Sequence, residues 1–136
     1  MPNIEKIREL QSKVMKDIAA GAIIPIMMIG DELGLFENLY QVGPCSSKDF
    51  AKKTEMDHRY LREWLLASSA AGYVNYDTKT EFFSLSDEQY SVLGDENSPS
   101  LMIGGFENLV GAVHNYHLIK QNFKSGAGTE WGSLHP

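Results

Sequence analysis

The chain has 136 residues, a formal net charge of −6 and a pI of about 5.1, which fits one acidic domain able to bury a core. Long-range repulsion disfavours nucleic acid as its partner. The longest apolar run, 22–29, is shorter than the roughly 20 residues of a membrane span, and the N-terminus lacks the apolar core of a signal peptide. With a single cysteine, Cys45, no internal disulfide can form, so a cytoplasmic protein without a membrane partner is expected.

Two helices are predicted in the first third of the chain. The first covers residues 3–20, and its apolar side chains recur at helical spacing: Ile4, Ile7, Val14 and Ile18, with Leu10 near the edge. The second begins near Ile24, because Pro25 is tolerated in a first turn, and closes near Phe36. It is apolar almost all round as far as Asp31, which is typical of a helix covered by a core or a second subunit.

Residues 46–86 show the order of elements of a winged helix-turn-helix. Ser46, with Asp49 three residues on, predicts the N-terminus of a short helix that ends near Thr54 and turns Phe50 and Ala51 inward. Asp57 caps a second, longer helix that ends at Gly72. The predicted buried face of this second helix consists of Leu61, Trp64, Leu65 and Ser68.

A hairpin and two further helices are predicted after the second helix. The strands 73–76 and 81–85 are joined by the turn 77–80, and Ser86 with Gln89 begins a short helix that fades at Gly94. Ser98 and Pro99 begin the last helix. The residues of one face of this helix recur at intervals of three and four: Phe106, Leu109, Val113, Tyr116, Lys120 and Phe123.

The sequence therefore predicts a mainly α fold, a winged helix-turn-helix with a small antiparallel β-hairpin and flanking helices suited to dimerisation. The domain is expected to span 1–124, and the glycine-rich segment 125–136 is expected to be a linker or tail. Both the 22–36 helix and the 99–123 helix carry more apolar surface than a small module can cover alone. A symmetric partner, that is a homodimer, is expected.

Arg59 and Arg62 are the candidate DNA-binding residues on the predicted recognition helix. Residues 46–66 carry five positive and four negative side chains, and the hairpin cancels that single charge. A face without net positive charge gains little from counterion release at phosphates. A winged-helix transcription regulator thus remains only the alternative function.

The histidines and the cysteine predict no metal or nucleophilic site. His114 and His117 lie one helical turn apart and could share a metal, but no third ligand stands at a matching spacing. Cys45 precedes a helix N-terminus, yet no base is positioned to activate its thiol.

Flexible apolar residues are candidates for a small-molecule pocket. Met27, Met28 and Phe106 could line it, and His114 or His117 could contact the ligand. Core packing is the alternative interpretation for each apolar residue. Residues 103–106 include two glycines but do not follow a strand, so no phosphate loop is predicted.

Several segments together resemble a known family. Residues 29–36 read IGDELGLF, residues 47–51 read SKDFA, and residues 59–66 and 70–74 read RYLREWLL and AAGYV. In this order they are similar to the N-terminal region of class I S-adenosylmethionine-dependent methyltransferases of the small-molecule O-methyltransferase type, within the Rv2258c-like group. The tail 128–136, GTEWGSLHP, is similar to the linker of these enzymes.

The resemblance implies a domain that forms dimers and helps to cover a substrate pocket. In that family a following Rossmann-like domain binds S-adenosylmethionine, and a small molecule accepts the methyl group. Its glycine-rich loop has no counterpart in this sequence, so no catalytic or cofactor-binding residue is assigned and the chain alone is not expected to transfer methyl groups. Pairing with a separate catalytic subunit remains a further alternative.

Overall fold

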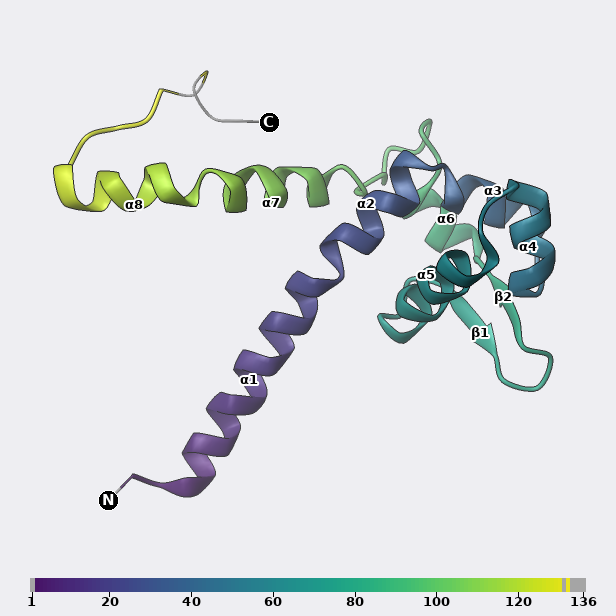
Figure 1. Ribbon diagram of the computed structural model, residues 1–136, viewed down its shortest axis with the longest axis horizontal. Helices are drawn as coiled ribbons and strands as arrows, with labels where there is room; N and C mark the ends of the chain where they lie inside the picture. Colours follow the sequence, from purple (N-terminus) through teal and green to yellow (C-terminus); the bar gives the residue numbers. More distant parts are fainter. Residues whose placement is uncertain (1, 131, 133–136) are drawn as a thin grey trace.

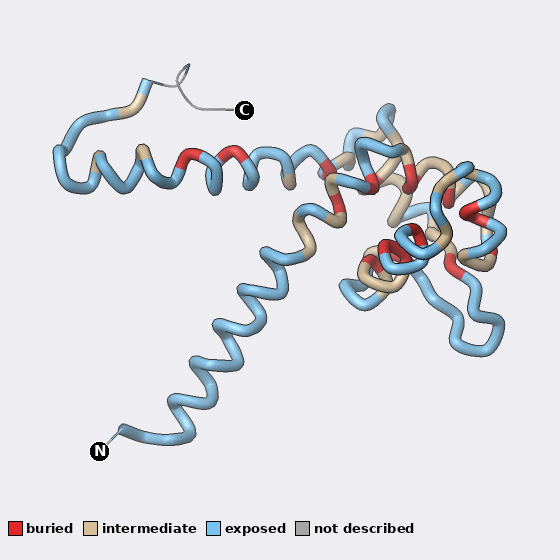
Figure 2. Tube along the Cα trace, in the orientation of Figure 1, coloured by how far each residue is buried: buried red, intermediate tan, exposed pale blue. Residues whose placement is uncertain are grey.

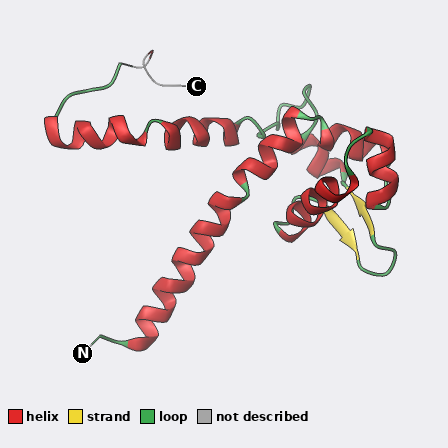
Figure 3. Ribbon diagram, in the orientation of Figure 1, coloured by secondary structure: helices red, strands yellow, loops and turns green. Residues whose placement is uncertain are grey.

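The computed structural model describes residues 2–130 and 132. In chain order its elements are α1 (Ile4–Ala22), α2 (Ile24–Glu32), α3 (Leu35–Val42), α4 (Ser47–Thr54), α5 (His58–Ala70), β1 (Asn75–Asp77), β2 (Phe82–Ser84), α6 (Asp87–Leu93), α7 (Gly105–His114) and α8 (Tyr116–Ser125). Helices α2 to α6 and the hairpin form a globular body, from which α1 and the α7–α8 pair extend as two arms (Figures 1 and 3).

The core lies inside the body and ties α2 to α5. Phe36, Phe50 and Leu65 are fully or almost fully buried at its centre. Trp64 packs edge-on against Phe36 with ring centroids 5.2 Å apart, and its indole N–H donates to the Ile26 carbonyl at 2.8 Å. The core therefore fixes the direction of α2 relative to the winged helix.

The wing is a two-stranded antiparallel sheet, and Cys45 forms a single bridge to its second strand. Tyr76 of β1 lies opposite Phe83 of β2. On its other side Phe83 exchanges two backbone hydrogen bonds with Cys45, of 2.9 and 3.1 Å. Because β2 is paired on both sides, the chain that enters α4 is attached to the wing.

The local signals of the winged helix-turn-helix are confirmed. The Ser46 hydroxyl accepts from the Asp49 N–H, the Asp57 carboxylate accepts from the Tyr60 N–H, and Ser86 forms the reciprocal capping box with Gln89. The buried face of α5 is the predicted one. The strands differ from the prediction: each has three residues, and the first is shifted to Asn75–Asp77, so that Asp77 of the predicted turn pairs with Phe82. The helix after Asp57 ends at Ala70, slightly before the predicted Gly72.

The predicted 24–36 helix is wrong at its C-terminal end. It stops at Glu32, and Gly34 adopts a left-handed backbone with φ of 63°. The chain then turns by 68° into α3, which the sequence analysis did not separate and which ends before Gly43. A glycine tolerates this conformation without steric cost, so one residue converts a continuous helix into a corner.

The helix predicted to open at Ser98 and Pro99 begins only at Gly105. The Ser98 hydroxyl accepts from the Ser100 N–H at 3.1 Å, and the Met102 N–H donates to the Val92 carbonyl at 2.9 Å. These bonds hold the segment before α7 as a loop against α6.

The same arm breaks again at Asn115, between α7 and α8. The Asn115 side-chain amide donates to the Gly111 carbonyl at 2.7 Å. The Asn115 backbone N–H donates to the same Gly111 carbonyl, at 3.1 Å, and Asn115 is the C-cap of α7, so the predicted single helix is two helices.

Among residues 2–130, no single helix is both long and apolar enough to cross a membrane. One bent pair, Ile4–Glu32 with Leu35–Val42, passes the same criteria of length and composition when the two are joined.

Candidate functional site

The α1 seam is an apolar stripe that faces solvent along its whole length. It consists of Ile4, Ile7, Leu10, Val14, Met15 and Ile18, whose exposed fractions lie between 43% and 65%. No residue of α1 is buried (Figure 2). A contiguous exposed apolar surface of this kind marks an interaction site in a soluble protein.

A second exposed apolar face runs along the α7–α8 arm. Its members are Leu109, Val110, Val113, Tyr116, Ile119 and Phe123. Phe123 is 88% exposed, the largest value among these residues, and Lys120 stands 5.9 Å from the centre of the Tyr116 ring. On this arm only Gly111 and Asn115 are buried.

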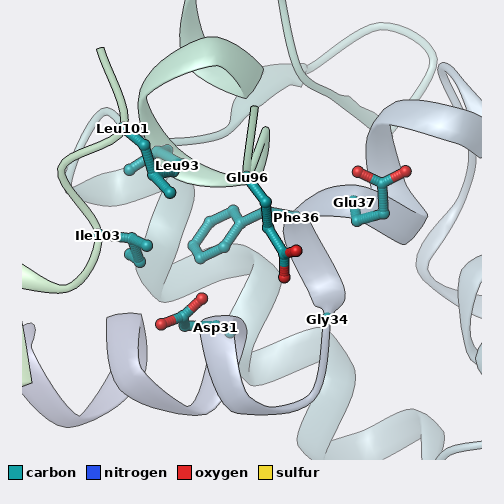
Figure 4. A pocket seen from close by; sticks show the side chains of 10 residues that line it. Asp31, Gly34, Phe36, Glu37, Leu93, Glu96, Leu101 and Ile103 are labelled. Atoms are coloured by element: carbon teal, nitrogen blue, oxygen red, sulfur yellow. The ribbon is translucent and has the colours of Figure 1, made fainter. Parts of the chain in front are cut away.

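A small acidic cavity lies between α2, α3 and the loop after α6 (Figure 4). Its volume is about 70 Å³, and Asp31, Glu37 and Glu96 contribute carboxylates to its lining. Partial burial and then the charge of Glu107 raise the pKa of Asp31. Small-molecule and cofactor pockets have volumes of roughly 300–1,000 Å³, so this cavity has room for water molecules but not for a cofactor or a drug-sized ligand.

A larger hollow, the α2–α5 groove, lies between the C-terminal end of α2 and the first half of α5, the recognition helix. Its volume is about 190 Å³, and its lining is apolar apart from Asp57: Ile29, Leu33, Leu35, Met56, Tyr60, Leu61 and Trp64. Tyr60 and Leu33 are at least half exposed at its mouth.

The five predicted pocket residues occupy two separate places. Met27 is fully buried in the core, and Met28 beside it is half-buried. Phe106 packs against the same core and lies edge-on to Tyr73, with centroids 6.2 Å apart. His114, at the end of α7, and His117, in the first turn of α8, are exposed, and His117 Nδ1 lies 3.1 Å from the His114 carbonyl oxygen. Their role in a pocket stays a prediction.

The candidate DNA-binding residues are held by local contacts. The Arg59 guanidinium lies over the Tyr60 ring, 4.6 Å from its centroid, and Arg62 Nη1 is 3.4 Å from Glu63 Oε1. Within the described residues, no group of three or more His, Cys, Asp or Glu side chains could hold a metal ion.

Cys45 is buried at the edge of the wing. Burial, and to a smaller extent the charge of Asp49, raises the pKa of its thiol. The thiol therefore stays protonated and unreactive near neutral pH.

Sequence reasoning missed the α2–α5 groove and the contact of α3 with α6. The groove joins side chains that lie up to 35 positions apart, from Ile29 to Trp64, and no local pattern predicts such a meeting. The one available signal was Tyr60, an aromatic residue on the exposed side of a helix whose buried face was already complete.

Residues 20–94 match the family model described as the Rv2258c-like winged HTH domain, and the chain belongs to this family. Among curated proteins, none matches the chain.

Solved structures share the fold, and the names of two of them describe methyltransferases. The mitomycin 7-O-methyltransferase MmcR is 20% identical with a TM-score of 0.64, and 91% of this chain covers 37% of that one. The N,N-8-amino-8-demethyl-D-riboflavin dimethyltransferase RosA from Streptomyces davawensis is 20% identical with a TM-score of 0.60, covering 90% and 34%. PigF, solved with SAH, is 11% identical with a TM-score of 0.54, covering 93% and 38%. The chain thus spans little more than a third of these structures.

Proposed function

We propose that this domain dimerises an S-adenosylmethionine-dependent methyltransferase and covers its substrate pocket, without catalytic activity of its own. Its membership of the Rv2258c-like winged HTH family and its fold likeness to an O-methyltransferase and a dimethyltransferase support the parent class. The proposed partners are a second copy, a Rossmann-like catalytic domain that binds the cofactor, and a small-molecule methyl acceptor. The proposed location is the cytoplasm.

The observation that carries the dimer is the α1 seam. The 19-residue helix places its apolar side chains in water and buries none of them. An isolated helix of this length is marginal in water, and most helical stability in proteins comes from packing of an apolar face. A second subunit that covers the seam supplies this packing.

The pocket-covering role would fall to the other arm and its base. Met28 and Phe106 lie near the junction of α2 and α7, and His114 and His117 lie where α7 meets α8. A ligand held by a neighbouring catalytic domain could meet the apolar side chains at one end and the imidazoles at the other. Met27 would support this surface from below, since it is fully buried.

Sedimentation velocity of the purified chain tests the dimer. The chain is expected to sediment as a dimer at micromolar concentration, and the variant Ile7→Glu/Val14→Glu is expected to sediment as a monomer because it places two charges in the seam. The matched control, Ser12→Glu/Ala20→Glu, adds the same charges to the opposite side of α1 and should remain dimeric. A native chain that is monomeric at high micromolar concentration would contradict the proposal.

Calorimetry tests the absence of a cofactor site. Titration of S-adenosylmethionine into the chain should give no stoichiometric heat of binding, because the site is proposed to belong to the catalytic domain. Stoichiometric binding to this chain alone would overturn that part of the proposal.

A further inference from the structure

The α1 seam and the α2–α5 groove lie at opposite ends of one helical rod, and both lack a cover within the chain. We infer that two copies pair through antiparallel rods formed by residues 4–32, so that α1 of each copy occupies the α2–α5 groove of the other. This inference rests on the proposed dimer and names the surfaces that form it.

The rod is continuous enough to act as one element. Helices α1 and α2 are separated only by Ile23, and α2 continues from the end of α1 with a bend (Figure 1). At 1.5 Å per residue the rod is about 43 Å long. From Ile18 to Ile29 the chain advances eleven residues, about three helical turns. The seam thus continues into Ile29 and Leu33, which are 45% and 50% exposed.

The chain cannot fill its own groove with its own α1. Ile29 and Leu33 line the groove at the C-terminal end of the rod, whereas α1 leads away from it at the N-terminal end (Figure 1). The stretch between them is helical and cannot fold back. An α1 that enters the groove must therefore come from another copy.

The groove has the size and chemistry that the seam requires. Buried side chains such as Leu61 and Trp64 form its floor, and its volume is about 190 Å³. An apolar cavity of about 150 Å³ admits benzene, so this groove admits an aliphatic side chain. Ile4 and Ile7, the first residues of the seam, are the side chains that an antiparallel pairing brings there.

Charge decides between antiparallel and parallel pairing. Lys6 and Arg8 flank the seam at the N-terminal end of the rod, whereas Glu32 ends the rod and Asp57 lines the groove. Antiparallel rods bring these cations to the partner's carboxylates, and parallel rods bring like charges together. Complementary charges of this kind fix orientation and register at an interface.

The antiparallel pairing is also two-fold symmetric and complete with two copies. A pairing that covers the seam from Ile4 to Leu33 has its two-fold axis near Ile18 and Gly21. A Cβ added at Gly21 would meet nothing within 4 Å in the single chain, so this side of the rod is open. A glycine beside the axis lets two backbones approach closely. Because each copy offers one seam and one groove, two copies satisfy both surfaces and no further copy is needed.

Cross-linking with two single-cysteine proteins tests the pairing. Ile7→Cys and Ile29→Cys are made separately in a Cys45→Ala background and treated with a short bismaleimide. Antiparallel rods place residue 7 near residue 29 of the partner and far from its own counterpart. When the two proteins are mixed and their dimers exchange subunits, a covalent dimer is therefore expected. Neither protein should cross-link efficiently alone.

Each other result has a defined meaning. Cross-linking of each protein alone would show parallel rods and overturn the inference. If the cysteine variants sediment as a dimer but the mixture forms no cross-link, the inference is also overturned, for instance in favour of pairing through the apolar face of the α7–α8 arm. The proposed dimer would then stand. Monomeric sedimentation of the native chain would remove both.

A charge reversal provides a second readout. Arg8→Glu should weaken dimerisation by about threefold to tenfold, as expected for two symmetric exposed ion pairs. Adding Glu32→Arg should restore most of the affinity, because the pair is re-formed with opposite polarity. Failure of the double variant to recover would count against the antiparallel register, whereas Lys16→Glu, on the opposite side of α1, serves as the control.

Discussion

At the residue scale, Gly30 sets how closely α2 approaches the core. A Cβ at this position would lie 2.6 Å from both Phe36 Cε2 and Trp64 Cζ2, two ring atoms of the core. Gly30→Ala should therefore destabilise the protein by about 1–3 kcal/mol through overpacking, despite the better helix propensity of alanine. Urea unfolding followed by tryptophan fluorescence measures the change.

Gly105→Ala is the matched control for this prediction. A Cβ at Gly105, the first residue of α7, meets nothing within 4 Å. The variant should be neutral or slightly stabilising, since alanine favours the helix. Equal effects at both positions would show that Phe36 and Trp64 do not limit how closely α2 approaches the core at Gly30.

Asp31, the next residue, has an ionised state that the fold disfavours. Burial, then Glu107, Glu32 and Glu96, raise its pKa above 3.8. The folded protein therefore binds this proton more tightly than the unfolded chain does, and stability is lost as pH rises through the folded pKa. Asp31→Asn removes that loss, so its stability gain over the native protein should be larger at pH 7 than at pH 4.

Asp77→Asn should behave in the opposite way. Hydrogen bonds from the Lys79 N–H and the Thr80 hydroxyl lower the pKa of Asp77. Its carboxylate contributes stability above pH 3.8 that is lost as pH falls through the lowered folded pKa. The asparagine variant should thus be less stable than the native protein at pH 7. Thermal melts of Asp31→Asn and Asp77→Asn across pH 3–8 test whether their stability changes have opposite signs.

At the element scale, a tyrosine pair clasps α3 to α6. Tyr40 and Tyr90 stack with centroids 4.0 Å apart, and Tyr40 donates to Asp87 Oδ1 at 3.0 Å while Tyr90 donates to Glu37. The bond to Glu37 raises the pKa of Tyr90 to about 12. This bond favours the protonated phenol, so its stabilisation is present below pH 10 and is lost as pH rises through about 12.

Tyr90→Phe keeps the stack and removes the hydroxyl. The variant should be less stable than the native protein between pH 7 and 9, and the difference should shrink as pH rises from 10 to 12. Urea midpoints in this range measure the difference. Tyr76→Phe is the control, because Tyr76 lies on β1, outside both the Tyr40–Tyr90 pair and the α2–α5 groove. A constant difference at every pH would contradict a role for the Tyr90–Glu37 bond.

The elements that the sequence predicted well are those specified by neighbouring residues. In α5 the Asp57 cap and the three-to-four spacing of Leu61, Trp64 and Leu65 act within one helix, and both the cap and the buried face were correct. The capping box of Ser86 and Gln89 likewise fixed the start of α6. These signals need no tertiary contact to operate.

The elements that failed depend on contacts between distant residues. Ser98 and Pro99 form a favourable helix start, yet the Met102–Val92 bond holds the following segment as a loop against α6. Apolar periodicity also continued across Gly34 and hid the corner between α2 and α3. The apolar stripe of α1 was predicted because it lies on one helix, but the excess apolar surface was assigned to the 22–36 and 99–123 helices and not to α1. The α2–α5 groove was missed because it needs two helices placed by the core.

At the scale of the whole molecule, stability is divided unequally. The body carries the buried core, whereas α1 and α8 have no buried residue. Helix formation has a costly nucleus, and segments without tertiary packing open at low free energy. In a single copy the arms should therefore open far more often than α5. A partner that covers α1 should reduce this difference in opening between α1 and α5.

Hydrogen exchange at two protein concentrations measures that change. At concentrations where the chain is monomeric, amides of 4–22 should exchange much faster than those of the buried turns of α5. Where the dimer predominates, protection of 4–22 should rise, because the seam must leave its partner before the helix can open. The Ile7→Glu/Val14→Glu variant should show fast exchange in α1 at both concentrations. Strong protection of α1 in the native chain at both concentrations, together with monomeric sedimentation, would mean that α1 is stable without a cover.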